Sequence, residues 1–121
     1  MSRVEIFVFG SNLQGRHGKG AALAALKLHG AQYGLGEGPQ GNSYAIPTKI
    51  TPYISLPLPE IEAAVERFKD FARNHPEVDF RVTPVGCGLA GYGPEQIGPM
   101  FRGCPLNCLL PVEFKPFLEE D

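Results

Sequence analysis

The chain has 121 residues, a length typical of one domain, and we expect a single domain over residues 1–121. Its hydrophobic content of 43% is enough to bury a core and too high for a disordered chain, and no apolar run approaches the roughly 20 residues that cross a bilayer. The formal net charge of −2 removes the simplest argument for a general nucleic-acid-binding protein.

The charge is distributed unevenly along the chain. Residues 1–50 contain five Lys or Arg against two acidic residues, a balance of +3, whereas the remainder contains six against eleven and carries −5. The positive half also holds a glycine-rich loop and two of the three histidines. This asymmetry favours a localised anion site over a broad basic face.

The cysteines indicate the cellular compartment. Three cysteines in a chain without the pattern of a signal peptide favour reduced thiols and a cytoplasmic location. Cys104 and Cys108 have metal-like spacing, but a zinc site needs about four ligands and the sequence has no second pair. We therefore expect no structural metal and no cofactor.

The first half of the chain predicts a strand, a loop and a helix. Val4–Phe9 is apolar and rich in β-branched and aromatic residues, as in a buried central strand. Ser11–Gly20 follows as a loop, and Ala21–His29 consists of strong helix formers that end at Gly30, a C-cap residue.

Shorter elements follow this helix. Residues 34–41 are glycine-rich and predict a loop or flap, and Ser43–Pro47 predicts a short strand with Thr48 and Lys49 at its end. Ile54–Leu58 is a short apolar segment interrupted by a proline.

The clearest helix is predicted over Glu60–Asn74. Pro59 suits the first helical position and Pro76 ends the helix. Apolar residues recur at helical spacing on one face, and we expect the opposite face to be solvated. The expected solvated residues are Glu62, Glu66, Lys69, Asp70 and Arg73.

A second strand, glycine loop and helix follow. Phe80–Val85 predicts a strand, Gly86–Gly93 a glycine-rich loop, Glu95–Arg102 a short helix and Cys108–Leu110 a last strand. Two such units on one sheet would bring both glycine loops to the same edge, where α/β proteins bind ligands.

The glycine loops suit phosphate binding, although their letters alone are weak evidence. Glycines allow positive φ and a close approach of the main chain to an anion. Gly86, Gly88 and Gly91 match the G-x-G-x-x-G fingerprint, but too little chain follows for a dinucleotide fold. Residues 15–20 (GRHGKG) lack the spacing of a Walker A loop. The alternative is that both loops are tight turns.

Three motifs in order carry a resemblance: FVFGSNLQGRHGKGAALAAL (7–26), SYAIPTK (43–49) and GCGLAGYG (86–93). They resemble the first glycine turn, a strand ending in Thr-Lys and the second phosphate-binding loop of macrodomains, the ADP-ribose-binding modules. The branch most similar contains the terminal ADP-ribose glycohydrolases and the DNA ADP-ribosyl glycohydrolase antitoxins. The chain is also similar to uncharacterised phage and bacterial proteins with FGSN, RHG-x-GAA, SYAIPTK and GCGLAG signatures.

The resemblance implies a compact macrodomain-like fold, a three-layer α/β/α sandwich with a mixed sheet. It implies that Asn12 hydrogen-bonds the distal ribose, that residues 18–21 wrap this ribose and the diphosphate, and that residues 86–92 hold phosphate through backbone N–H groups. The implied ligand-binding residues are Asn12, Gly18, Gly20, Ala21, Gly86, Cys87, Gly88, Leu89, Ala90, Gly91 and Tyr92.

The resemblance also implies a reactive lysine. Lys49 matches the lysine that in this branch acts on the anomeric carbon of the ADP-ribosyl group, as a Schiff-base amine or by stabilising the departing group. The alternative is a surface lysine at a strand end. His17 is a candidate phosphate contact or acid–base group, or else an exposed loop histidine. Cys87 is either an activated thiol or a small packed residue, and the second is favoured.

Two departures limit the resemblance. Ala90 stands where the terminal glycohydrolases have an aspartate, although the DNA-directed branch has a small residue there. The segment that supplies an adenine-binding aspartate is also absent. Three hypotheses therefore stay open. The first is a hydrolase that removes ADP-ribose from a macromolecule (nucleic acid or protein) or a metabolite. The second is a non-catalytic module that binds ADP-ribose or a related nucleotide, and the third is a phage-type accessory protein whose glycine loops are only turns.

Overall fold

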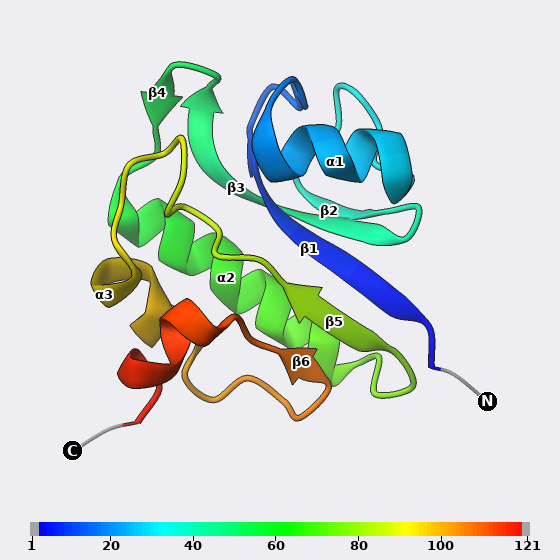
Figure 1. Ribbon diagram of the computed structural model, residues 1–121, viewed down its shortest axis with the longest axis vertical. Coiled ribbons are helices and arrows are strands. Elements are labelled where there is room, and N and C mark those ends of the chain that lie inside the picture. The colour runs from blue at the N-terminus through cyan, green and yellow to red at the C-terminus, as the bar shows by residue number, and fades with distance from the viewer. Residues whose placement is uncertain (1–2, 120–121) are drawn as a thin grey trace.

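The computed structural model describes residues 3–119 and contains a six-stranded mixed sheet with helices (Figure 1). The mixed α/β class predicted from the sequence is confirmed. The elements in chain order are β1 (Glu5–Asn12), α1 (Gly20–Leu28), β2 (Gly38–Gln40), β3 (Ser43–Thr51), β4 (Ile54–Ser55), α2 (Leu58–Arg73), β5 (Asp79–Val82), α3 (Pro94–Ile97), the 3₁₀ helix η1 (Gly98–Phe101), β6 (Cys108–Leu109) and the 3₁₀ helix η2 (Val112–Phe117). Within this part of the chain, no helix is long and apolar enough to span a bilayer.

The sheet has β1 near its centre. The strand order is β2-β3-β1-β5-β6, and β4 pairs with the far end of β3. β1 is parallel to both β3 and β5, and β5 is parallel to β6, whereas β2 and β4 are antiparallel to β3. The carboxyl ends of β1, β3 and β5 therefore lie along one edge of the sheet.

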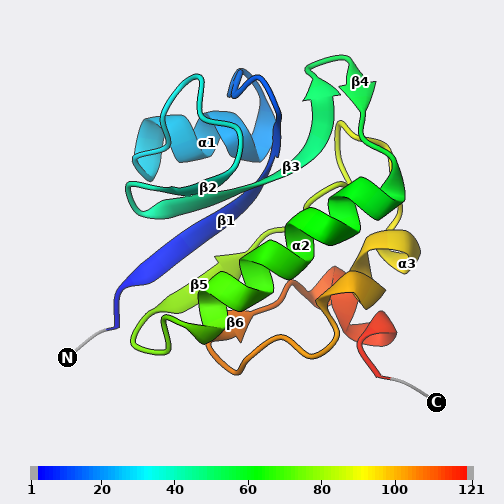
Figure 2. The same cartoon turned by 180° about the vertical axis from the view of Figure 1, so that it is seen from behind.

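The two longer helices cover opposite faces of this sheet (Figures 1 and 2). Val8 packs in the larger core cluster together with α2, whereas its neighbour Phe9 packs in a smaller cluster with α1. Successive strand residues point to opposite faces, so these two clusters flank β1. The chain crosses from β1 to β3 in one direction and from β3 to β5 in the other, and right-handed crossovers then place their helices on opposite faces.

Helix α2 confirms the predicted amphipathic helix, with one exception. Its apolar residues are buried against the sheet, as the spacing predicts. Lys69, however, was expected on the solvated face and is only 5% exposed. Its ammonium donates to the carbonyl oxygens of Met100 at 3.0 Å and Arg102 at 2.6 Å, and to the Glu66 carboxylate at 2.9 Å. Buried charge is tolerated here because each donor has an acceptor.

Several predicted boundaries are corrected by the structure. β1 continues to Asn12, into the predicted loop, and β2 forms within the segment 34–41 that was expected to be irregular. The helix expected over Glu95–Arg102 is split between α3 and η1, because Pro99 has no N–H to continue the α-helical hydrogen bonds. β5 ends at Val82, earlier than expected, two residues before Pro84.

Candidate functional site

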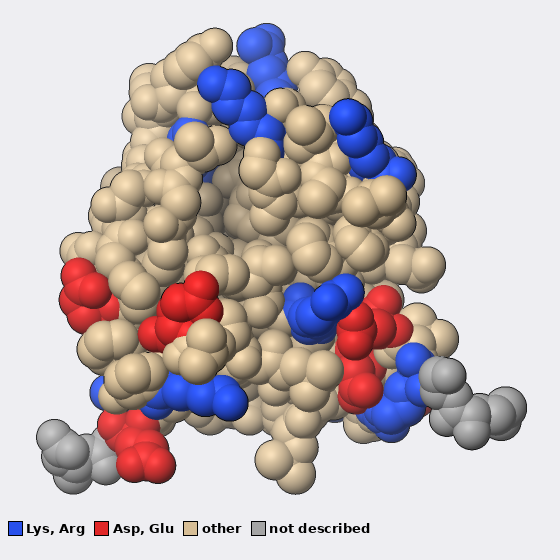
Figure 3. Space-filling view, in the orientation of Figure 1, with Lys and Arg blue, Asp and Glu red and all other residues tan. Residues whose placement is uncertain are grey.

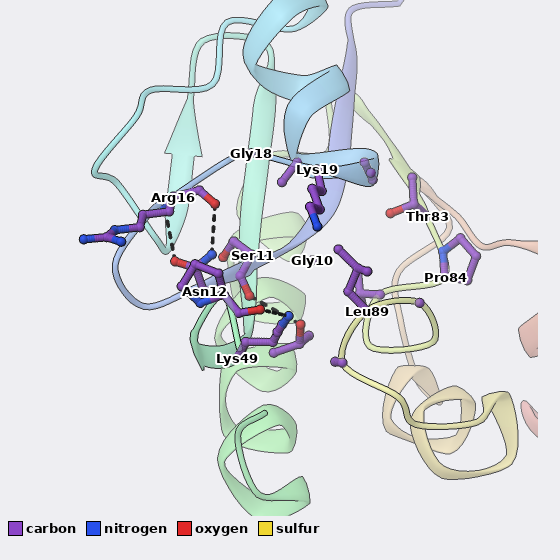
Figure 4. Close-up of a pocket in the computed structure, with 18 of the residues that line it drawn as sticks. Gly10, Ser11, Asn12, Arg16, Gly18, Lys19, Lys49, Thr83, Pro84 and Leu89 are labelled. Atoms are coloured by element: carbon purple, nitrogen blue, oxygen red, sulfur yellow. Dashed lines mark hydrogen bonds between the residues drawn. The ribbon is translucent and has the colours of Figure 1, made fainter. Parts of the chain in front are cut away.

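A cleft of about 740 Å³ opens at the carboxyl edge of the parallel strands (Figure 4). The end of β1, which lies between β3 and β5 in the sheet, forms the floor of the cleft. From there the chain leaves the sheet toward α1 on one face. Such a change of direction in the strand order leaves a crevice at the sheet edge. Residues from four segments form its walls: 16–22, 48–53, 83–85 and 88–90.

The cleft brings together the three motifs that are far apart in the sequence. Asn12, at the end of β1, lies beside Lys49 of β3 in the sheet register. The register shifts between Ser11 and Asn12, so that Thr48 is an extra residue in β3. A bulge of this kind re-aims the side chains next to it, and both Thr48 and Lys49 line the cleft. The expectation that both glycine loops meet at one sheet edge is confirmed.

One wall of the cleft is the N-terminus of α1. Lys19 is the N-cap residue and Gly20, Ala21 and Ala22 form the first turn, and all four line the cleft. The first N–H groups of a helix have no partner inside the helix. Among residues 3–119 no side chain caps this end, and the first turn contains no acidic residue. The N–H groups are thus available to a ligand in the cleft.

The opposite wall is the glycine loop that follows β5. Positive φ angles of 77° at Gly86 and 85° at Gly91 fold the loop back on itself, and the Tyr92 N–H donates to the Gly86 carbonyl at 2.9 Å. Within residues 3–119, no backbone hydrogen bond uses the N–H groups of residues 88–90, and these residues line the cleft. The loop therefore carries, at the cleft, a second set of N–H groups without a backbone acceptor in the described chain.

Two hydrogen bonds brace this loop against the segment after β3. The Ser55 hydroxyl donates to the Ala90 carbonyl at 2.7 Å, and the Tyr92 hydroxyl donates to the Leu56 carbonyl at 2.6 Å. Tyr92 also packs against the larger core cluster and does not line the cleft. Its side chain supports the loop and is turned away from a ligand.

Two glycines on the cleft wall have no structural reason to be glycine. Gly18 and Gly88 do not have positive φ, and a Cβ at either position would meet no heavy atom within 4 Å. By contrast, Gly15 and Gly36 lie so close to other backbone atoms that a Cβ cannot fit. Glycine at a position with open space on a cleft wall suits a ligand that approaches the backbone closely.

The cleft is cationic. Arg16, Lys19 and Lys49 line it, and its described lining residues include no Asp, Glu or His. Lys and Arg side chains lie around the hollow in the upper part of the molecule, whereas the acidic side chains seen on this face lie in its lower half (Figure 3). Three of the five basic residues in the positive half of the sequence thus meet at one cleft.

The predicted site residues Asn12 and Lys49 both engage the protein itself. Asn12 is 6% exposed, and its side-chain amide makes two hydrogen bonds with the backbone of Arg16, one as donor and one as acceptor. The Lys49 ammonium donates to the Pro52 carbonyl oxygen (Figure 4). Each residue lines the cleft, but a ligand would compete with these bonds.

His17 lies behind the cleft. Its ring is fully buried, packs edge-on against Phe9 at 5.2 Å between centroids, and donates from Nε2 to the Leu35 carbonyl at 3.1 Å. Within the described chain its Nδ1 has no hydrogen-bond partner. The position argues against the predicted phosphate contact and acid–base role, because neither a ligand nor water reaches the ring.

The remaining predicted loop residues divide into two groups. Gly18, Gly20, Ala21, Gly88, Leu89 and Ala90 line the cleft. Gly86, Cys87, Gly91 and Tyr92 do not, and they shape or support the loop from below. Cys87 packs against the larger core cluster, and burial, with Glu95 and Glu113 nearby, raises the pKa of its thiol. This position favours the packed residue over the activated thiol.

Sequence reasoning assigned no side-chain role to the lining residues Arg16, Lys19 and Tyr53, although Lys19 lies within the segment 18–21 that the resemblance places around the ribose and the diphosphate. Arg16 and Lys19 contribute to the positive charge balance of residues 1–50. This balance indicates an anion site but does not identify the residues that form it. Tyr53 is 89% exposed on the turn between β3 and β4 and is the aromatic side chain among the described lining residues. No local pattern distinguishes it from an ordinary turn residue.

The described residues contain no group of three His, Cys, Asp or Glu side chains placed to hold a metal ion. No family model, no curated protein and no solved structure matches the chain. The fold and the cleft define a class: a mixed α/β protein with a cationic cleft at the carboxyl edge of its parallel strands, walled by two sets of backbone N–H donors.

Proposed function

We propose that the chain is a macrodomain-like protein that binds ADP-ribose or a related nucleotide in this cleft. The observation that carries the proposal is the pair of N–H walls, α1 on one side and residues 88–90 on the other, around a cationic hollow. Backbone donors of this kind bind phosphate oxygens. The two walls suit a ligand with linked phosphates, and helices on both faces of the sheet are consistent with the three-layer sandwich that the resemblance implies.

The proposed chemistry is removal of ADP-ribose from a modified nucleic acid or protein. In this mechanism the Lys49 amine attacks the anomeric carbon, the bond from this carbon to the acceptor breaks, and water then releases ADP-ribose from the lysine. In the alternative, water attacks the anomeric carbon and the Lys49 cation stabilises the departing acceptor. Lys49 lies at the end of β3, beside the end of β1, where the ribose would follow the phosphates. Its ammonium must first leave the Pro52 carbonyl, so substrate binding would have to displace this hydrogen bond.

The same hydrogen bond favours a second candidate function, binding without turnover. The Lys49 nitrogen is engaged by the Pro52 carbonyl oxygen, and the described lining residues contain no carboxylate or imidazole to act as a base beside it. A non-catalytic module that senses or sequesters ADP-ribose needs only the two N–H walls and the cations. Tyr53, which is exposed and lines the cleft, is a candidate to stack on the adenine ring in either case.

Isothermal titration calorimetry with ADP-ribose tests the binding proposal. We expect binding by the wild type and loss of binding in Gly88→Glu, because the new carboxylate would occupy the phosphate position in open space. Leu106→Glu is the matched control, since Leu106 is fully exposed outside the cleft and the charge change is the same. If the wild type does not bind ADP-ribose at millimolar concentration, both the hydrolase and the binding module are contradicted, and the accessory-protein hypothesis is favoured.

Turnover is tested separately with Lys49→Ala. ADP-ribosylated DNA and ADP-ribosylated protein are incubated with the wild type and with the variant, and released ADP-ribose is measured. Release by the wild type and not by Lys49→Ala supports the hydrolase. Binding without release by the wild type supports the non-catalytic module, and equal release by both proteins contradicts the lysine mechanism.

A further inference from the structure

The two lysines that line the cleft differ in what they contact. Lys49 donates to the Pro52 carbonyl and is partly buried. Lys19 is exposed, makes no capping hydrogen bond and belongs to no ion pair among the residues that the structure describes. Figure 4 shows its side chain projecting from the α1 wall toward the wall that carries Leu89. Lys19 is thus the lysine whose ammonium is available in the cleft.

Lys19 stands at a position that is unfavourable for a cation. It is the N-cap residue of α1, where Ser, Thr, Asp and Asn are preferred and where the helix dipole disfavours positive charge. The first turn supplies no acidic side chain to offset it. Arg16, also basic, lines the same wall, although Figure 4 shows its side chain directed away from the middle of the cleft. A residue that breaks local preferences without a partner in the protein indicates a function.

An anion between the two walls would resolve this conflict. It would accept hydrogen bonds from the first turn of α1 and from residues 88–90, and it would neutralise the Lys19 ammonium at the same time. Two linked phosphates offer an anionic group to each wall, whereas a single phosphate offers only one. The Lys19 ammonium projects from one wall toward the other and would thus face a ligand that spans the two walls (Figure 4).

We propose that Lys19 is a specificity-determining residue that makes the cleft select diphosphate ligands over monophosphates. This inference rests on the proposed function of the cleft and adds to it a role for the side chain of Lys19, which lies within the segment 18–21 that the resemblance places around the ribose and the diphosphate. Lys19 contributes to ligand binding and lowers the stability of the free protein. A ligand with two adjacent phosphates gains from its charge, and a nucleoside monophosphate gains less.

The test measures affinity and stability in matched lysine variants. Lys19→Met removes the charge and retains the length of the side chain, and Lys19→Arg retains the charge. Lys27→Met is the control, because Lys27 lies on the same helix, is exposed and does not line the cleft. Titrations use ADP-ribose and AMP at two salt concentrations, and thermal melting is recorded without ligand.

We expect Lys19→Met to lose about tenfold or more in affinity for ADP-ribose, with less loss for AMP, and Lys19→Arg to restore it. The affinity of Lys19→Met should also depend less on salt, since one charge is removed. Its melting temperature without ligand should equal or exceed that of the wild type, which separates a binding role from a structural one.

Three results would overturn the inference. ADP-ribose affinity of Lys19→Met equal to that of the wild type shows that Lys19 does not bind the ligand, while the proposed function stands. An equal loss in Lys27→Met shows a general effect of charge. Equal losses for ADP-ribose and AMP remove the selectivity for diphosphate. Absence of ADP-ribose binding by the wild type would contradict the proposed function itself. The wild-type titration therefore distinguishes failure of the proposed function from failure of the Lys19 inference.

Discussion

The side-chain amide of Asn12 closes a ring with the backbone of Arg16: Nδ2 donates to the Arg16 carbonyl and Oδ1 accepts from the Arg16 N–H, each at 3.0 Å. The amide therefore holds the loop that leads from β1 into α1. The resemblance assigns Asn12 to the ribose, and the geometry shows that it also determines where the α1 wall of the cleft stands.

Replacement of Asn12 should accordingly affect the loop before it affects chemistry. We expect Asn12→Ala to lower the free energy of unfolding by about 1–3 kcal/mol, because two hydrogen bonds of a buried side chain are lost. Asn12→Asp retains the acceptor but sets a carboxylate oxygen against the Arg16 carbonyl oxygen at a buried site, so its effect should be at least as large. Urea unfolding measures the stability, and amide hydrogen exchange of Arg16 reports the loop. Unchanged exchange in Asn12→Ala would show that the ring does not hold the loop.

Two glycines of the second loop should respond in opposite ways to alanine. Gly86 has a φ of 77°, and a Cβ there would lie 3.1 Å from the Ile97 side chain, so Gly86→Ala should destabilise the fold by about 1–2 kcal/mol. Gly88→Ala enters open space and should leave stability unchanged while lowering affinity for ADP-ribose. Melting temperature and titration are measured for both variants. Equal affinity of Gly88→Ala and the wild type would mean that no ligand approaches this backbone.

Much of the fold could be predicted because the signals are local. The apolar spacing of α2 and the β-branched run of β1 depend on neighbours in the sequence, and both elements form as expected. The boundaries were less predictable, since strand ends are determined by pairing. β1 reaches Asn12 only because β3 continues beside it to Lys49.

The site could be predicted only in outline. The three motifs name segments that meet at the cleft, but they do not say which side chains face it. His17 follows the pattern of an exposed loop residue and is buried by packing against Phe9, a tertiary contact without a local signal. The direction of the Lys19 side chain likewise depends on the position of α1 relative to residues 88–90, which the sequence does not give.

Lys69 is a buried cation, although the amphipathic pattern of α2 predicts that it is exposed to solvent. Lys69→Met would remove the donor from the carbonyls of Met100 and Arg102. We expect the free energy of unfolding to fall by about 1–3 kcal/mol, because the buried acceptors lose their partner. Lys27→Met, on an exposed surface, should stay within about 0.5 kcal/mol of the wild type. Urea unfolding compares them. A more stable Lys69→Met would show that desolvation of the ammonium outweighs its hydrogen bonds.

The thiol of Cys87 should be unreactive at neutral pH although it lies in the glycine loop. Burial, followed by the nearby carboxylates of Glu95 and Glu113, raises its pKa above the ordinary value. The thiolate is the reactive form, so a raised pKa leaves less of it at pH 7.5 and shifts the rise of the alkylation rate to higher pH. Iodoacetamide labelling followed by peptide mass spectrometry measures the rate across pH 7–10.

Cys104 provides the comparison within the same chain. The hydrogen bond from the Cys108 thiol, with Lys69 and Arg73 nearby, lowers the pKa of Cys104, so it should be labelled at lower pH than Cys87. Glu95→Gln removes a negative charge near Cys87 and should move its labelling curve toward lower pH without bringing it to that of Cys104, because burial remains the larger cause. Rapid labelling of Cys87 at pH 7.5 in the wild type would contradict the packed position and return the thiol to the list of reactive groups.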